Sequence, residues 1–171
     1  MNIPKKLTIV PPDLIPKGLD CPTDNLADLY KLGLLLQTIC TQENGVGLSA
    51  VQVGIPLNFF VINYDYLSQK ESYRFFVNCM YSPLSEQKVE SVEGCLSLRN
   101  PNNEIRHFEV ERFQDISIKG KELVANPKLE IKDFELIPTD YFKIIFQHEI
   151  DHARQILISD IGKEVFLWRR K

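Results

Sequence analysis

Hydrophobic positions recur at helical spacing in the first third of the chain. They predict a helix that begins after Thr23 or Asp24 and ends near Glu43, where Asn44-Gly45 is a stop signal. An apolar face formed in this way packs into a core. The residues on that face are Leu26, Leu29, Tyr30, Leu36 and Cys40. The thiol among them is read as a buried apolar filler rather than as a metal ligand.

Strand patterns follow this helix. Residues 57–64 and 73–80 are runs of β-branched and aromatic residues, joined by the polar stretch 65–72. This arrangement predicts a hairpin with a long connection. Residues 88–92 alternate apolar and polar side chains, so we expect a further strand that leads into Glu93-Gly94-Cys95-Leu96-Ser97.

The second half of the chain alternates again over residues 106–118, which predicts one strand followed by a tight turn at 119–122. Residues 127–136 also alternate, so a second antiparallel pair is expected there. Pro138-Thr139-Asp140 predicts the start of a second helix, capped by Thr139 or Asp140.

The two ends of the chain carry weaker patterns. Prolines recur through residues 1–22, which predicts an extended arm without regular structure. Residues 160–171 are expected to form a short tail, with Arg169-Arg170-Lys171 in solvent. We interpret residues 1–171 as a single catalytic domain, because this length suits one domain with a substantial core.

Composition narrows the class of protein. The chain is 44% hydrophobic and 25% charged, with a net charge of −3, as in a globular protein in solution. It has no block of like charges that would follow a nucleic-acid backbone, and no apolar run of the roughly 20 residues that a membrane helix needs. The four cysteines form no C-x-x-C pair, and the N-terminus lacks a secretory pattern. We therefore expect reduced thiols and a cytoplasmic protein.

The chemistry centres on Gln147-His148-Glu149-Ile150-Asp151-His152, which holds two of the three histidines of the chain. Residues i and i+4 of a helix share one face, so His148 and His152 can bind the same metal ion. Glu149 projects from an adjacent part of the helix surface, where it can reach a bound water. A third ligand is then needed, and the Cys95 thiolate would suit zinc or ferrous iron.

A glycine-containing segment, Gly45-Val46-Gly47-Leu48-Ser49-Ala50-Val51-Gln52, precedes the first predicted strand. Its glycines would let a substrate peptide approach the backbone closely, although a plain turn into the next strand is the simpler explanation. Gln52 adds a neutral side-chain donor that could stabilise a developing oxyanion.

The three motifs at 45–52, 93–97 and 147–152, in this order, resemble those of the peptide deformylase family, and the likeness runs from about residue 25 to 156. The resemblance implies an α+β fold in which antiparallel strands pack around a central metal-binding helix. It also implies that Cys95, His148 and His152 bind one divalent ion. Iron as Fe²⁺ is the ion expected in the cell, with Zn²⁺, Ni²⁺ or Co²⁺ as alternatives.

By the same resemblance, the reaction removes the formyl group from the N-terminal formyl-methionine of nascent polypeptides at the ribosome and releases formate. Glu149 would be the general acid and base for a metal-bound water. The Gln52 side chain and the Leu96 backbone N–H would donate to the formyl oxygen. The expected state is a monomer without a nucleic-acid site or a membrane contact.

The side chain of the substrate's first residue would enter an apolar pocket walled by Val46, Tyr141, Ile144 and Ile145. The substrate backbone would pair with Val46, Gly47 and the segment near Glu93. Tyr141 is bulkier than the family resemblance leads us to expect. A polar insertion at residues 99–103 and the sequence Ala153-Arg154-Gln155 after the last histidine also depart from the family pattern.

Asp151 points away from the metal-facing side of its helix, and a buried carboxylate there would need a partner. The strand containing Arg112 resembles the family strand that supplies this partner. We expect a bidentate ion pair between Arg112 and Asp151 that orients the helix. The alternative is that Arg112 is solvated and that Asp151 pairs with Arg106, His107 or water.

Two other functions remain open from the sequence. An H-E-x-x-H protease would take its third ligand downstream, where only Asp160 and Glu164 follow. A catalytically degenerate relative that only binds nascent N-termini is the other alternative. It would have no use for the proton-transfer group Glu149 or for Gln52.

Overall fold

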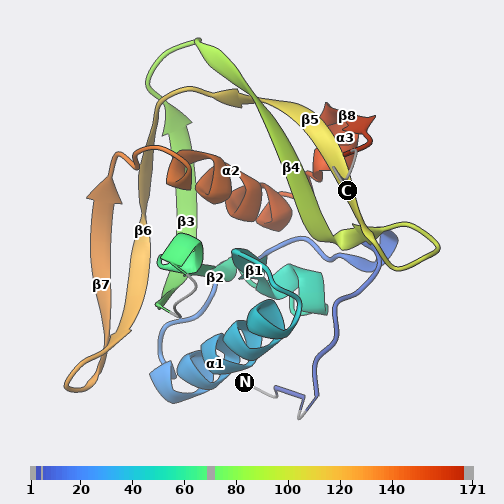
Figure 1. The fold of residues 1–171 in the computed structure, drawn as a ribbon. Coiled ribbons are helices and arrows are strands. Elements are labelled where there is room, and N and C mark those ends of the chain that lie inside the picture. Colours follow the sequence, from blue (N-terminus) through green and yellow to red (C-terminus); the bar gives the residue numbers. More distant parts are fainter. Residues whose placement is uncertain (1–2, 5, 69–71, 168–171) are drawn as a thin grey trace.

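The structure, a computed structural model, describes residues 3–4, 6–68 and 72–167. In this part of the chain, helices pack against two separate antiparallel sheets, ordered β1-β2-β3-β6-β7 and β4-β5-β8. The fold is therefore α+β, as expected, and helix α2 lies between the two sheets (Figure 1). The helices are α1 (Leu26–Gln42), α2 (Phe142–Ala153) and α3 (Ile158–Ile161). The strands are β1 (Gly47–Ser49), β2 (Phe59–Asn63), β3 (Tyr73–Pro83), β4 (Lys88–Arg99), β5 (Ile105–Phe113), β6 (Ile116–Ala125), β7 (Leu129–Leu136) and β8 (Gly162–Val165).

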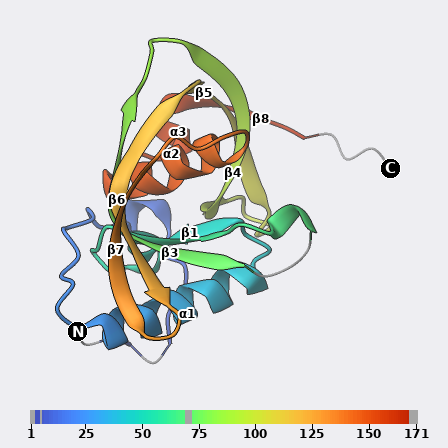
Figure 2. The same cartoon turned by 90° about the vertical axis from the view of Figure 1, so that its left-hand side faces the viewer.

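The alternation of side chains along β2 explains the layers. Phe59 and Val61 face one side of the sheet and pack with α1, whereas Phe60 and Ile62 face the other side and pack with α2. Figure 2 shows α1 on the far side of the five-stranded sheet from α2. All of β2 is buried because both of its faces are covered.

Helix α1 has the predicted extent but a different cap. The side chain of Asn25 accepts a hydrogen bond from the Asp28 backbone N–H at 3.1 Å, so the prediction of Thr23 or Asp24 was wrong. Cys40 is fully buried on the apolar face of the helix, as predicted. Cys21 and Cys79 are also buried, and all four thiols are free.

The predicted hairpin is present as β2 and β3, which pair antiparallel. Strand β4 is longer than predicted, because Glu93 to Ser97 lie within it rather than after it. The glycine-containing segment also has regular structure: β1 covers Gly47–Ser49, and a 3-10 turn, η2, covers Ala50–Val53.

The prediction of one strand over residues 106–118 was wrong. The chain leaves the three-stranded sheet at the end of β5 and enters the five-stranded sheet as β6, with a break at Gln114-Asp115. No Gly or Pro marks this break. The predicted turn at 119–122 lies inside β6, which pairs with β3 and β7. A Cβ on Gly120 would lie 2.5 Å from the Cys79 sulfur. The lack of a side chain at this position therefore lets β6 approach β3 closely.

Helix α2 begins at Phe142, and its N-cap is Tyr141 without a capping side-chain hydrogen bond. The predicted caps Thr139 and Asp140 were therefore wrong. Asp140 instead has a φ of 49°, a left-handed conformation that turns the chain into the helix.

The described residues near the two ends of the chain differ in how much regular secondary structure they contain. Among the described residues before α1, Pro12–Leu14 form a short 3-10 turn, η1, and Leu19 makes an isolated β-bridge with Leu57. Residues 160–165 are not a tail, because they complete α3 and form β8, which pairs with β5. Residues 169–171 lie outside the described residues. Among the helices that the structure describes, none is long and apolar enough to cross a membrane.

Candidate metal centre and active site

Three potential metal ligands from two elements converge between the sheets. Strand β4 supplies Cys95, and α2 supplies His148 and His152. One donor atom of each residue lies within 4.8 Å of the others. The Cys95 sulfur is 3.5 Å from Nε2 of His152. The β4–β5 register shifts between Gly94 and Arg99, so Cys95 lies where the ladder is interrupted and the strand can turn its side chain toward the helix.

The ring of His148 is oriented by Glu93. Nδ1 of His148 lies 2.8 Å from the Glu93 carboxylate. Burial alone would raise the pKa of Glu93, but hydrogen bonds from Arg112 and His148 lower this pKa to about 2. An ionised carboxylate only accepts, so Nδ1 must donate, which leaves Nε2 of His148 available as a metal ligand. Burial lowers the pKa of His152 well below its usual value, which keeps that imidazole neutral.

Arg112 sits at the centre of a buried ion-pair network. Its guanidinium donates two hydrogen bonds to Glu93, at 2.8 and 2.9 Å, and one to Asp151 at 2.6 Å. The expected contact with Asp151 is thus present, but the bidentate partner is Glu93, so that detail of the prediction was wrong. Asp151 also accepts a hydrogen bond from Tyr81 at 3.0 Å. The network therefore links β3 and β5 to the residue that orients His148.

Glu149 is buried beside the three ligands and has 4% of its surface exposed. Burial raises the pKa of its carboxyl group to about 7, and a bound cation would lower it. Its Oε2 atom has no hydrogen-bond partner among the described residues. A Cβ on Gly47 would lie 2.5 Å from Oε1 of Glu149, so only glycine leaves room for this carboxylate.

The Gln52 side chain has a fixed orientation. Its Oε1 accepts from the Ser49 backbone N–H at 2.9 Å, so its amide nitrogen must point the other way. That nitrogen lies 3.2 Å from Oγ of Ser97 and 3.6 Å from the sulfur of Cys95. The amide donor therefore faces the metal-ligand cluster. Leu96, next to Cys95, lines the same cavity.

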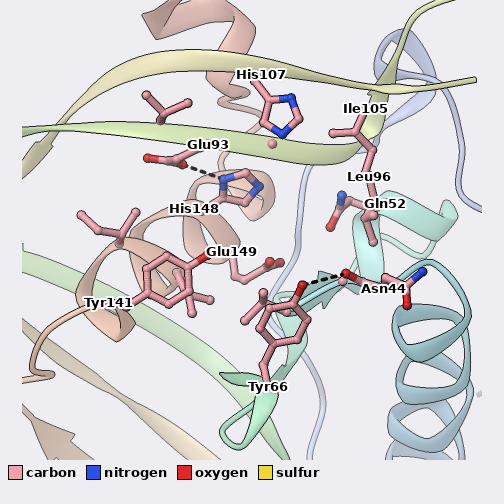
Figure 3. Close-up of a pocket in the computed structure, with 17 residues that line it drawn as sticks. Asn44, Gln52, Tyr66, Glu93, Leu96, Ile105, His107, Tyr141, His148 and Glu149 are labelled. Atoms are coloured by element: carbon pink, nitrogen blue, oxygen red, sulfur yellow. Dashed lines mark hydrogen bonds and ion pairs between the residues drawn. The ribbon is translucent and has the colours of Figure 1, made fainter. Parts of the chain in front are cut away.

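A cavity of about 270 Å³ opens beside this cluster (Figure 3). All six residues predicted to contact substrate line it: Val46, Gly47, Glu93, Tyr141, Ile144 and Ile145. The Glu93 side chain, however, is held by Arg112 and His148. Sequence reasoning missed other wall residues, among them Asn44, Tyr66, Ile105 and His107. No motif marks them, because they come from loops and from β5, which reach the cavity only through the tertiary fold.

The cluster fits a single divalent ion. One thiol and two imidazoles form a three-ligand set that leaves a coordination position open, as in catalytic sites rather than structural ones. The unpartnered carboxylate oxygen of Glu149 lies in the same buried region, where it can accept a proton from a water molecule. Fold and site together define an α+β metal-dependent hydrolase.

The polypeptide deformylase family model matches residues 21–165, and the chain belongs to this family. The resemblance seen in the sequence is thereby confirmed. The chain is 30% identical to peptide deformylase of Maricaulis maris over 162 residues, which covers 94% of this chain and 85% of that protein. It is 34% identical to peptide deformylase of Aquifex aeolicus over 133 residues, which covers 76% and 69% of the two chains.

Solved structures agree with this assignment. A plant peptide deformylase superimposes with a TM-score of 0.76 at 26% identity, covering 94% of this chain and 83% of that one. A peptide deformylase from Plasmodium falciparum gives a TM-score of 0.72 at 30% identity, with 91% and 86% covered. The chain is therefore an enzyme of the deformylase family, which removes the N-formyl group of nascent polypeptides, and the two alternative functions are not favoured.

Proposed function

We propose that this chain deformylates N-terminal formyl-methionine by using Glu149 as the general acid and base, with Cys95, His148 and His152 as the metal ligands. The observation that carries this assignment is the convergence of the three ligands beside the buried carboxylate of Glu149. When bound, a divalent ion supplies an activated water and polarises the formyl group. We expect this ion to be Fe²⁺, with Zn²⁺, Ni²⁺ or Co²⁺ as alternatives.

Glu149 moves the proton. Its carboxylate accepts a proton from the attacking water and returns it to the leaving amine, which yields formate and a free N-terminus. Burial favours the protonated form of this carboxyl group, whereas a bound ion favours the carboxylate that the first step needs. The Gln52 amide nitrogen and the Leu96 backbone N–H donate to the formyl oxygen as negative charge builds there. The Gln52 donor needs little reorganisation, since Ser49 already holds the other end of its amide.

The substrate peptide lies in the cavity between β1 and β4. Val46, Gly47 and the backbone near Glu93 pair with its main chain, and Tyr141, Ile144 and Ile145 contact the side chain of its first residue. Arg112 and Asp151 act as positioning residues, since they fix Glu93 and, through it, His148. The enzyme functions as a single domain in the cytoplasm, as a monomer acting on nascent chains at the ribosome.

The test is formate release from a formyl-methionyl peptide by protein loaded with Fe²⁺ or Ni²⁺ under reducing conditions. We expect turnover by the wild type, and loss of both metal and turnover in Cys95→Ser. An H-E-x-x-H protease with a downstream ligand would keep its metal in this variant. A binding module would retain the peptide without releasing formate, and that outcome would contradict the proposal.

A further inference from the structure

A second, smaller cavity of about 190 Å³ adjoins the cavity of the active site. The two cavities share four wall residues: Val46, Tyr66, Tyr141 and Ile145. The remaining wall comes from the end of β2 and the connection after it, and from the segment that leads into α2. The rings of Tyr64 and Phe142 stack there at 4.4 Å between centroids. Neither the three metal ligands nor Glu149 lines this second cavity. The second cavity therefore suits an apolar side chain of a ligand rather than the bond that is cleaved.

Two tyrosine rings stand where the cavities meet. Tyr66 comes from η3 (Tyr66–Ser68) in the β2–β3 connection, and Tyr141 precedes α2. In Figure 3 both lie on the side of the active-site cavity opposite Glu93 and His107. Both are partly exposed, at 38% and 49%, so a ligand can reach them.

Tyr66 is tied to the segment proposed to pair with substrate. Its hydroxyl group donates to the Asn44 carbonyl at 3.4 Å, shown as a dashed line in Figure 3. Asn44 has a φ of 54° and directly precedes Gly45 and Val46. The ring of Tyr66 is thus held across one side of the cavity, between the β2–β3 connection and the substrate-pairing segment.

We propose that Tyr66 is a specificity-determining residue that contacts the side chain of the substrate's first residue, and that the second cavity receives the far end of a long apolar side chain. This inference rests on the proposed function, which places that side chain against Tyr141, Ile144 and Ile145. Two of these residues, Tyr141 and Ile145, also line the second cavity. Aromatic rings on two sides favour a thioether, because sulfur makes favourable contacts with ring edges.

The test compares kcat/KM for formate release from two peptides that differ only in the first residue, formyl-methionine or formyl-alanine. The alanine side chain is too short to reach the second cavity. In Tyr66→Ala we expect kcat/KM for the methionyl peptide to fall about tenfold, the upper end of a sulfur–aromatic contact. For the alanyl peptide, kcat/KM of this variant should stay within about twofold of the wild-type value. Tyr66→Phe keeps the ring and should retain the preference for methionine.

Tyr66→Leu gives a second measurement, since it keeps an apolar side chain in η3 but removes the ring. It should show the same selective loss. Equal losses of kcat/KM with both peptides, or no loss with either, would overturn the inference. Tyr66 would then support only the local structure, or have no effect on the reaction. Failure of the proposed function is a separate result: wild-type protein loaded with metal would release no formate from either peptide, and both proposals would fall.

Discussion

Replacing Arg112 with alanine should destabilise the fold far more than replacing Arg106 with alanine. The two arginines lie on the same strand, β5, and each donates two hydrogen bonds to one glutamate. They differ in burial. The Arg112 side chain is 3% exposed and its partners Glu93 and Asp151 are 6% and 4% exposed, whereas Arg106 and Glu164 are 36% and 35% exposed.

The magnitude follows from this difference. Removing Arg112 leaves two carboxylates buried without their cation, and such a loss costs about 3–5 kcal/mol of unfolding free energy. For a chain of this size it corresponds to a fall in Tm of roughly 6–20 °C. Removing Arg106 breaks an exposed pair and should cost about 0–1 kcal/mol. Arg112→Lys keeps the charge but not the planar fork, so we expect an intermediate loss.

The assay is urea unfolding of all three variants and the wild type at one pH, with the metal ion saturating throughout. Formate release should be measured in parallel, because kcat/KM should fall in Arg112→Ala once Glu93 no longer fixes the ring of His148. Equal losses of stability in Arg112→Ala and Arg106→Ala would refute the reasoning, since burial would then have no bearing on the strength of the two pairs.

Three further predictions concern the site. Glu149→Gln should keep its metal while kcat falls by at least about 100-fold, because an amide cannot accept the proton; near-normal formate release would refute its role. Gly47→Ala should lower kcat without changing metal content, because the added Cβ would lie 2.5 Å from the Glu149 carboxylate and must displace it; unchanged kcat would contradict this close approach. Cys95→Ser should reduce bound metal measured by elemental analysis, whereas the control Cys79→Ser should keep one ion per chain, since a hydroxyl is a poorer ligand than a thiolate. Metal loss in the control would argue against Cys95 as the sulfur ligand.

Local patterns predicted the parts of the fold that local interactions decide. Spacing of i and i+4 placed His148 and His152 on one face of a helix, and two runs of β-branched and aromatic residues identified the β2–β3 hairpin. The helix caps were misassigned, because Asn25, which caps α1, is as good a capping residue as its neighbour Asp24, and α2 begins without a side-chain cap. A preference for a cap is worth about 1 kcal/mol, which packing can override.

The change of sheet at Gln114-Asp115 could not be predicted, because alternation continues across it without a turn signal. The same limit applies to the site. The position of Cys95 beside the histidines came from the family resemblance and not from spacing, and Tyr66 was not identified by any pattern. These contacts join elements that are distant along the chain, and a local pattern carries no information about such pairs.

The placement of the ligands on separate elements has a mechanical consequence. Cys95 belongs to the three-stranded sheet and His152 to α2, and they are 57 residues apart along the chain. An ion bound to both, as proposed, is a reversible cross-link that closes this loop. Because the ion binds the folded chain and is released on unfolding, saturating metal stabilises the fold by mass action, by about 4 kcal/mol at a free concentration about 1,000 times Kd. Chelation should therefore loosen the attachment of the three-stranded sheet to α2 and lower the unfolding temperature of the whole domain, and metal supply would set how long the protein persists as well as how fast it works.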